Sequence, residues 1–153
     1  MAEAVARYDL VHWAPTWAGM FISIAVLLLL APLGVAIGLT SGTGAAVWGF
    51  ISLIVAFFVG GWVVGRTLSI EDSLIAGAHG LLSWAVALSF LLLTTVLLGA
   101  IRIPLILPTI IVPTEAVAGA SLVTFFAFLV SAIAGVVGAV TGNQSRPYLR
   151  RVP

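Results

Sequence analysis

The chain has 153 residues, of which 62% are hydrophobic and only 7% are charged. A soluble domain carries about 25% charged residues. A water-soluble fold of this length cannot cover so much apolar surface, so lipid must replace water around much of the protein. The net charge of +1 argues against nucleic-acid binding, which needs a clustered basic face. The absence of cysteine excludes disulfides, thiolate metal sites, iron–sulfur clusters and a cysteine nucleophile.

Long apolar segments predict an all-α membrane protein with four transmembrane helices, paired as two antiparallel hairpins in a single domain. Residues 1–14 come first and predict a short interfacial helix or arm. Residues 143–153 form a basic tail. The four spans are expected at residues 17–39, 45–65, 73–100 and 115–142.

The arginines predict the orientation of these spans. Five of them lie in the N-terminal arm, the loop after the second span and the tail, which share one side of the membrane. Arg102 alone lies on the other side. Because positively charged loops stay in the cytoplasm, both termini are predicted to be cytoplasmic.

Residues 101–114 form an apolar loop that is predicted to be extracytoplasmic. Pro104, Pro108 and Pro113 exclude a regular helix there, yet most of the other residues are Ile, Leu or Val. An apolar loop of this kind is expected at the membrane surface or against another protein.

Glycines at four-residue spacing recur near the ends of the spans. Such pairs let helix backbones approach closely in a membrane. We expect most of them to pack the four spans against one another, and the alternative is that some face outward and dock other chains. The predicted packing glycines are Gly34, Gly38, Gly61, Gly65, Gly138 and Gly142 in these pairs, and Gly80 in a stripe of small residues along the third span.

The spans contain no Asp, Glu, Lys or Arg apart from Glu115 at the start of the fourth. Ser69 and Asp72 have the spacing of a capping box before the third span. Glu71 and Glu115 also precede or begin helices, where a negative charge suits the helix dipole. Arg66 is expected to fix the topology and to be able to pair with Glu71 or Asp72.

His79 is the histidine that falls inside an apolar span. We expect it to pack against a neighbouring helix, hydrogen-bonded to that helix or to Ser83. We expect that the protein binds no cofactor and no metal. The alternative is an axial ligand for a haem or bacteriochlorophyll. A haem held by two histidines is not expected in one protomer, because His12 lies in the arm. A homodimer could present two copies of His79, and a chlorophyll-type magnesium needs only one ligand.

The pattern GGWxxGR at residues 60–66, followed by HGLxxW at residues 79–84, resembles a widespread group of small, uncharacterised bacterial inner-membrane proteins. The resemblance covers about residues 12–93. It implies a helical bundle in the bacterial cytoplasmic membrane and implies no activity. It marks one structural or binding unit, made of Gly61, Gly65, Arg66, His79 and Trp84.

These observations predict a non-enzymatic membrane protein, an accessory or structural subunit that packs with other membrane proteins or with itself. Ionisable groups inside spans are the usual sign of transport or catalysis. Here Asp, Glu, Lys and Arg are missing from the spans apart from Glu115 at a span start, and His79 is the one ionisable side chain within an apolar run. One alternative is a small channel or carrier for a neutral solute, in which Pro32 and the glycine-rich helix ends allow rearrangement. The other alternative is a carrier for the cofactor at His79.

Overall fold

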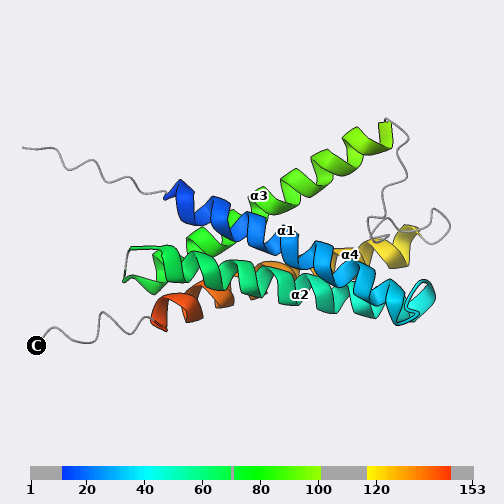
Figure 1. Cartoon of the computed structure of the whole chain (residues 1–153), viewed down its shortest axis with the longest axis horizontal. Helices are drawn as coiled ribbons and strands as arrows, with labels where there is room; N and C mark the ends of the chain where they lie inside the picture. The colour runs from blue at the N-terminus through cyan, green and yellow to red at the C-terminus, as the bar shows by residue number, and fades with distance from the viewer. Residues whose placement is uncertain (1–11, 70, 101–116, 146–153) are drawn as a thin grey trace, which may run out of the picture.

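The computed structural model describes residues 12–69, 71–100 and 117–145, and this part of the chain is all helical (Figure 1). Each of the four helices is long and apolar enough to cross a membrane. Most of the predicted arm, the 101–114 loop, Glu115 and most of the basic tail lie outside the described residues. The helices are α1 (Trp13–Ala36), α2 (Gly42–Thr67), α3 (Ser73–Ala100) and α4 (Val117–Gln144).

Helix α1 begins four residues before the predicted span. Pro15 lies in the first turn of α1. The backbone N–H groups of a first turn have no partner within the helix, so a residue that lacks an N–H is tolerated there. His12 is the N-cap residue, and the hydroxyl of Thr16 donates to the His12 carbonyl at 3.1 Å.

Helix α1 ends in a tight turn around Gly38, which differs from the packing role predicted for this glycine. Gly38 has φ +82°. Its N–H donates to the Val35 carbonyl at 3.0 Å, and the Leu39 N–H donates to the Gly34 carbonyl at 2.9 Å. This pair of bonds is a Schellman motif, which needs a left-handed residue at the position of Gly38. A Cβ on Gly38 would meet nothing within 4 Å, so the glycine serves the turn and not a helix contact.

Trp48 joins α1 and α2 near this turn. Its indole lies against Gly34, where a Cβ would collide with the ring. The indole N–H donates to the Leu30 carbonyl at 2.9 Å. Gly34 therefore makes room for a side chain and not for a second backbone.

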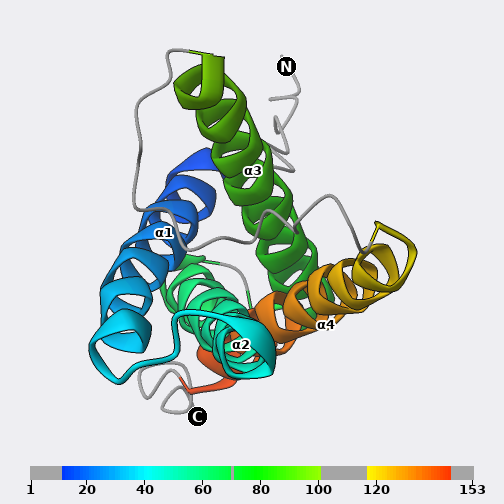
Figure 2. The same cartoon turned by 90° about the vertical axis from the view of Figure 1, so that its right-hand side faces the viewer.

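Helix α2 lies between α1 and α4 (Figure 2). Gly60 packs against Gly19 and Ser23 of α1. On the opposite flank, a Cβ on Gly61 or Gly65 would collide with a backbone carbonyl of α4. The buried residues of α2 form a broad stripe along the helix, which is Ser52, Leu53, Ala56, Phe57, Gly60, Gly61, Val64 and Gly65.

Helices α2 and α4 approach most closely through glycines on both sides. Gly61 faces the Gly135 carbonyl and Gly65 faces that of Ala139. In return, Gly138 and Gly142 of α4 face carbonyls of α2. Because the contacts advance along both helices together, α2 and α4 run parallel. The tightest pair in the protein is thus not a pair of sequence neighbours.

Helix α3 stays with the bundle for only part of its length. Its first half packs on α1, α2 and α4, and its second half diverges from all three in both views (Figures 1 and 2). We call this second half, residues 87–100, the distal half of α3. Phe90, Leu93 and Val96 there are 46%, 65% and 70% exposed.

Candidate functional site

The titratable side chains that the structure describes gather at one end of the bundle, where α1 and α3 begin and α2 and α4 end. We call this the charged end. Its members are His12, Arg66, Glu71, Asp72 and His79. Polar chemistry in the described part of the chain is therefore concentrated here, and the site is built from these residues.

His79 of α3 is 4% exposed, and both of its ring nitrogens make hydrogen bonds. Nδ1 lies 2.8 Å from the carbonyl oxygen of Ile75. Nε2 lies 2.9 Å from the backbone nitrogen of His12. A carbonyl only accepts and a backbone N–H only donates, so Nδ1 must carry the proton and Nε2 must be the acceptor. The geometry therefore defines a neutral imidazole in a single tautomer.

The two histidines of the chain meet at this point, although they are 67 residues apart. Their ring centroids are 5.9 Å apart and the ring planes are inclined at 56°. The Nδ1 atom of His12 is buried and has no hydrogen-bond partner among the described residues. The polar composition of residues 1–14 predicts an interfacial segment, and therefore a His12 that lies away from His79. The contact between the two histidines differs from this prediction.

This geometry bears on the predicted axial ligand. A metal bound to His79 would need the lone pair of Nε2, which accepts the His12 N–H in this structure. Binding would displace that bond and leave a buried backbone N–H without a partner. Haem and bacteriochlorophyll therefore remain predictions from sequence. No group of three or more metal-ligating side chains comes together among the described residues.

Ser83 lies one turn beyond His79 and extends the contact between α1 and α3. It was predicted as a partner of His79, but its hydroxyl donates to the Thr16 carbonyl at 3.1 Å. Gly19 lies beside it, and a Cβ on Gly19 would collide with Val64 of α2 and approach the Ser83 hydroxyl. Three helices therefore converge on the missing side chain of Gly19.

Gly80 and Trp84, in the same part of α3, contact α4. A Cβ on Gly80 would lie 2.6 Å from the Gly135 carbonyl oxygen. One turn further, the indole N–H of Trp84 donates to the hydroxyl of Ser131 at 2.9 Å. Among the positions marked by the family resemblance, Gly61, Gly65, His79 and Trp84 thus all lie at contacts between helices.

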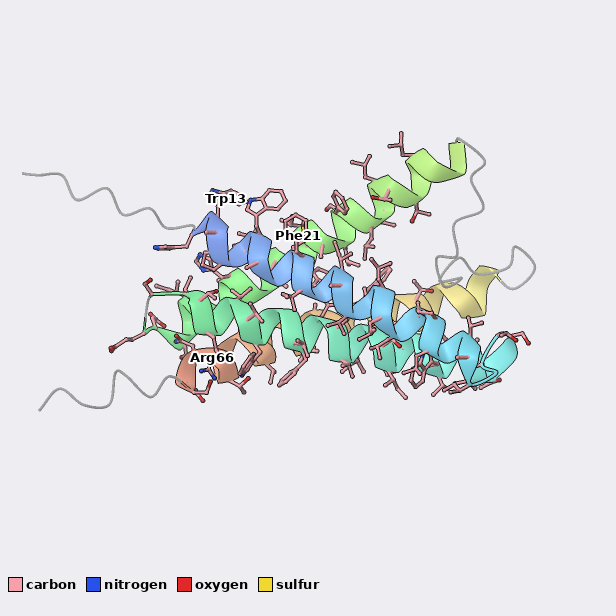
Figure 3. The ribbon with its side chains drawn as sticks, in the orientation of Figure 1. Trp13, Phe21 and Arg66 are labelled. Carbon is pink, nitrogen blue, oxygen red and sulfur yellow. The ribbon has the colours of Figure 1, made fainter. Side chains whose placement is uncertain are left out.

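Arg66 is exposed at the end of α2, and its guanidinium lies 4.8 Å from the ring centroid of Trp62. This distance is typical of a cation–π contact. Arg66 makes no ion pair with Glu71 or Asp72, the two acids described near it. Its side chain lies at the charged end in Figure 3, with the aromatic ring of Trp62 in place of the carboxylate that the sequence suggested.

The start of α3 is capped by a different residue from the one that the predicted capping box named. Helix α3 begins at Ser73, so Ser69 lies too early to cap it. Asp72 caps instead, since its Oδ1 accepts the Leu74 N–H at 2.8 Å. Asn143 of α4, which was not among the residues predicted from the sequence, donates to the backbone carbonyl of Glu71 at 3.0 Å. The one feature of the sequence that could have indicated a contact for Asn143 is its position directly after the packing glycine Gly142.

Aromatic side chains mark the outer surface of α1 near the charged end. Trp13 and Phe21 point away from the helix (Figure 3) and are 55% and 57% exposed. Trp17 lies between them and stacks on Phe21 with centroids 6.1 Å apart. Exposed tryptophans at one end of a span are typical of the interface between lipid and water.

Comparison with known proteins gives no relative, because no family model, curated protein or solved structure matches this chain.

Proposed function

We propose that the protein is a non-enzymatic structural subunit of a bacterial inner membrane, with both termini cytoplasmic, that packs with other membrane proteins or with copies of itself. Four helices of sufficient length and apolarity support the membrane part of this proposal. The observation that carries the rest is the exposure of the distal half of α3.

The distal half of α3 makes few contacts with other helices among the described residues, and Leu91 is the last of its side chains that packs against the core. In the most apolar window of α3, 17% of the residues are buried, compared with 33–39% in the other three helices. Exposed apolar side chains suit lipid and need no protein cover. Interhelical contacts, however, are what hold a membrane bundle together, and half of α3 makes few. A partner helix at this position would supply the missing packing.

Four hydroxyl groups within the spans support a non-enzymatic role. Ser89, Thr94 and Thr95 donate to carbonyls one turn earlier in α3. Ser23 does the same in α1. A hydroxyl bonded in this way is satisfied by its own helix. None of these four has a described acid or base beside it that would activate it as a nucleophile.

Extraction in a mild detergent, followed by a native gel and mass spectrometry, tests the proposal. We expect a species larger than one 15.9 kDa chain, formed by copies of the protein or by a co-purifying membrane protein. A strictly monomeric protein with no co-purifying partner would contradict it.

Cross-linking in native membranes tests where a partner binds. The chain contains no cysteine, so single cysteines can be introduced without removing any. Leu93→Cys places one on the distal half of α3, and Leu29→Cys places one on α1 at a position that is 71% exposed. Both side chains face lipid in a lone protomer. We expect cross-links from Leu93→Cys and few from the matched control.

A further inference from the structure

The contact between His12 and His79 depends on the charge of one imidazole. We propose that it is a proton-sensitive latch: neutral His79 holds the start of α1 against α3, and protonation of His79 releases it. This device is independent of whether the protein is a structural subunit, because it involves only contacts within one chain.

The latch follows from the hydrogen-bond roles of the His79 ring. Nδ1 already donates to the Ile75 carbonyl at 2.8 Å, so an added proton can go only to Nε2. That nitrogen would then become a donor facing a second donor, the His12 N–H, with the two nitrogens 2.9 Å apart. Turning the ring does not help, because both nitrogens of an imidazolium carry protons. Protonation therefore removes the acceptor and replaces an attraction with a repulsion.

No described group compensates for a charge on His79. From α1, the group that faces it is His12, and a proton on that ring would add repulsion. From α2, Arg66 is a cation and lies against Trp62. Glu71 and Asp72 are exposed and form no ion pair with His79, and the described residues of α4 include no titratable side chain. The charged ring has no described partner that would keep it in place.

Release is expected to be limited to the first turn of α1. The side chain of His12 makes no capping bond to α1. The hydrogen bond that ties the start of α1 to α3 at this point is therefore the one from the His12 backbone N–H to His79 Nε2. One turn later, the Ser83 hydroxyl donates to the Thr16 carbonyl, and neither of these groups titrates. The bond at Thr16 therefore persists and acts as the pivot, while Trp13 and Ala14 become free to move.

Spin labelling tests the latch in lipid nanodiscs, because the native chain has no cysteine to replace. A nitroxide on Ala14→Cys, an exposed position in the first turn, reports the motion of that turn. We expect an ordered spectrum at neutral pH and a mobile component that grows reversibly as the pH falls. A nitroxide on Leu29→Cys, on the same helix beyond the pivot, should show no such change.

Two substitutions distinguish the contribution of His79 to the pH response from that of His12. His79→Gln keeps a polar side chain that does not titrate, so the pH response at Ala14→Cys should be lost. His12→Gln removes the other imidazole but keeps the backbone N–H that forms the bond, so the response should persist. A response that survives in His79→Gln, or one that disappears in His12→Gln, would overturn the proposal.

A direct measurement guards against a His79→Gln variant that fails to fold. Nitrogen-15 NMR of the histidine rings in the native sequence should show His79 protonated at Nδ1 and bare at Nε2 at neutral pH. The opposite tautomer would overturn the latch. So would a His79 that gains its second proton while the label on Ala14→Cys stays ordered.

Discussion

Single side chains join helices that the sequence holds far apart. The Trp84 indole donates to the Ser131 hydroxyl at 2.9 Å, and that hydroxyl donates to the Phe128 carbonyl. Ser131 is fully buried. The bond fixes the distance between α3 and α4 just before the two helices diverge. A tryptophan in a span needs such a partner, because lipid offers none.

A double-mutant cycle with Trp84→Phe and Ser131→Ala measures this bond. Hydrogen bonds between membrane helices contribute about 0.6 kcal/mol on average, so we expect a coupling free energy of about 0.5–1.5 kcal/mol. Reversible unfolding in mixed micelles supplies the four free energies. Additive effects of the two substitutions would show that the bond does not stabilise the protein.

Gly38→Ala tests the turn after α1. The left-handed conformation at φ +82° costs a residue with a Cβ about 1–2 kcal/mol. We expect the free energy of unfolding to fall by about 1 kcal/mol, although the added methyl group meets nothing within 4 Å. Gly49→Ala is the control, because Gly49 lies inside α2, has no positive φ and also has open space around it. Equal effects at both positions would argue against strain at Gly38.

At the scale of helices, the parallel pair α2 and α4 is the centre of the molecule. Glycines of each helix face carbonyls of the other, so the two backbones touch without side chains between them. Van der Waals contact of this kind stabilises helix pairs in lipid, where the hydrophobic effect does not act between spans. A single added methyl group must push the two axes apart.

Gly61→Ala and Gly138→Ala test this contact. In each, the new Cβ would collide with a carbonyl of the facing helix. Overpacking of this type costs about 1–3 kcal/mol, and we expect a loss of that size in the free energy of unfolding. Gly49→Ala adds the same methyl group to α2 where no neighbour lies within 4 Å and should be neutral or stabilising. If the free energy of unfolding of Gly49→Ala falls as much as that of the two test variants, the close approach of α2 and α4 is not the cause of the loss.

The sequence identified the spans because their apolarity is continuous, and it identified Gly61, Gly65, Gly138 and Gly142 as sites of close approach. It did not identify which helices these glycines join, since a glycine pair shows that a backbone can be approached but not by which neighbour. Gly38 has the same spacing from Gly34 as a packing pair, yet it forms a turn. The spacing alone does not distinguish the two uses.

The charged end was harder to predict than the spans. The predicted arm at residues 1–14 ended too late, because a proline is tolerated in a first turn and α1 already begins at Trp13, which brings His12 to His79. Likewise, Ser69 has the spacing of a cap, but Asp72 lies next to the true start of α3. Local motifs compete at helix ends, and packing decides among them.

At the scale of the whole molecule, the bundle is closed at the charged end and open beside the distal half of α3 (Figure 1). α1 and α2 are joined at both ends of their contact, by Gly60 against Ser23 and by Trp48 against Gly34. α3 and α4 are joined near Gly80 and Trp84. Contacts between helices therefore hold one side of the molecule together, and the described residues beside the distal half of α3 form fewer such contacts.

Distances between paired nitroxides test this asymmetry. Labels on Leu93→Cys and Val123→Cys span the gap between α3 and α4, and both positions are more than 60% exposed. We expect a broad distance distribution in the isolated protomer, because Leu93 lies beyond Leu91, the last side chain of α3 that packs against the core. Labels on Leu29→Cys and Val47→Cys, across the α1–α2 contact, should give a narrow one. A narrow distribution for both pairs would mean that α3 holds its divergent position without a partner.

The central place of α2 also has a consequence for synthesis. A ribosome completes α2 well before α4, so the flank of α2 that carries Gly61 and Gly65 enters the bilayer before the helix that covers it exists. Until then the nascent chain presents bare backbone to lipid, and another copy's α4 can dock there as well as its own. A chain truncated before Val117 keeps that surface permanently, and such fragments should be captured by full-length protein made in the same cell.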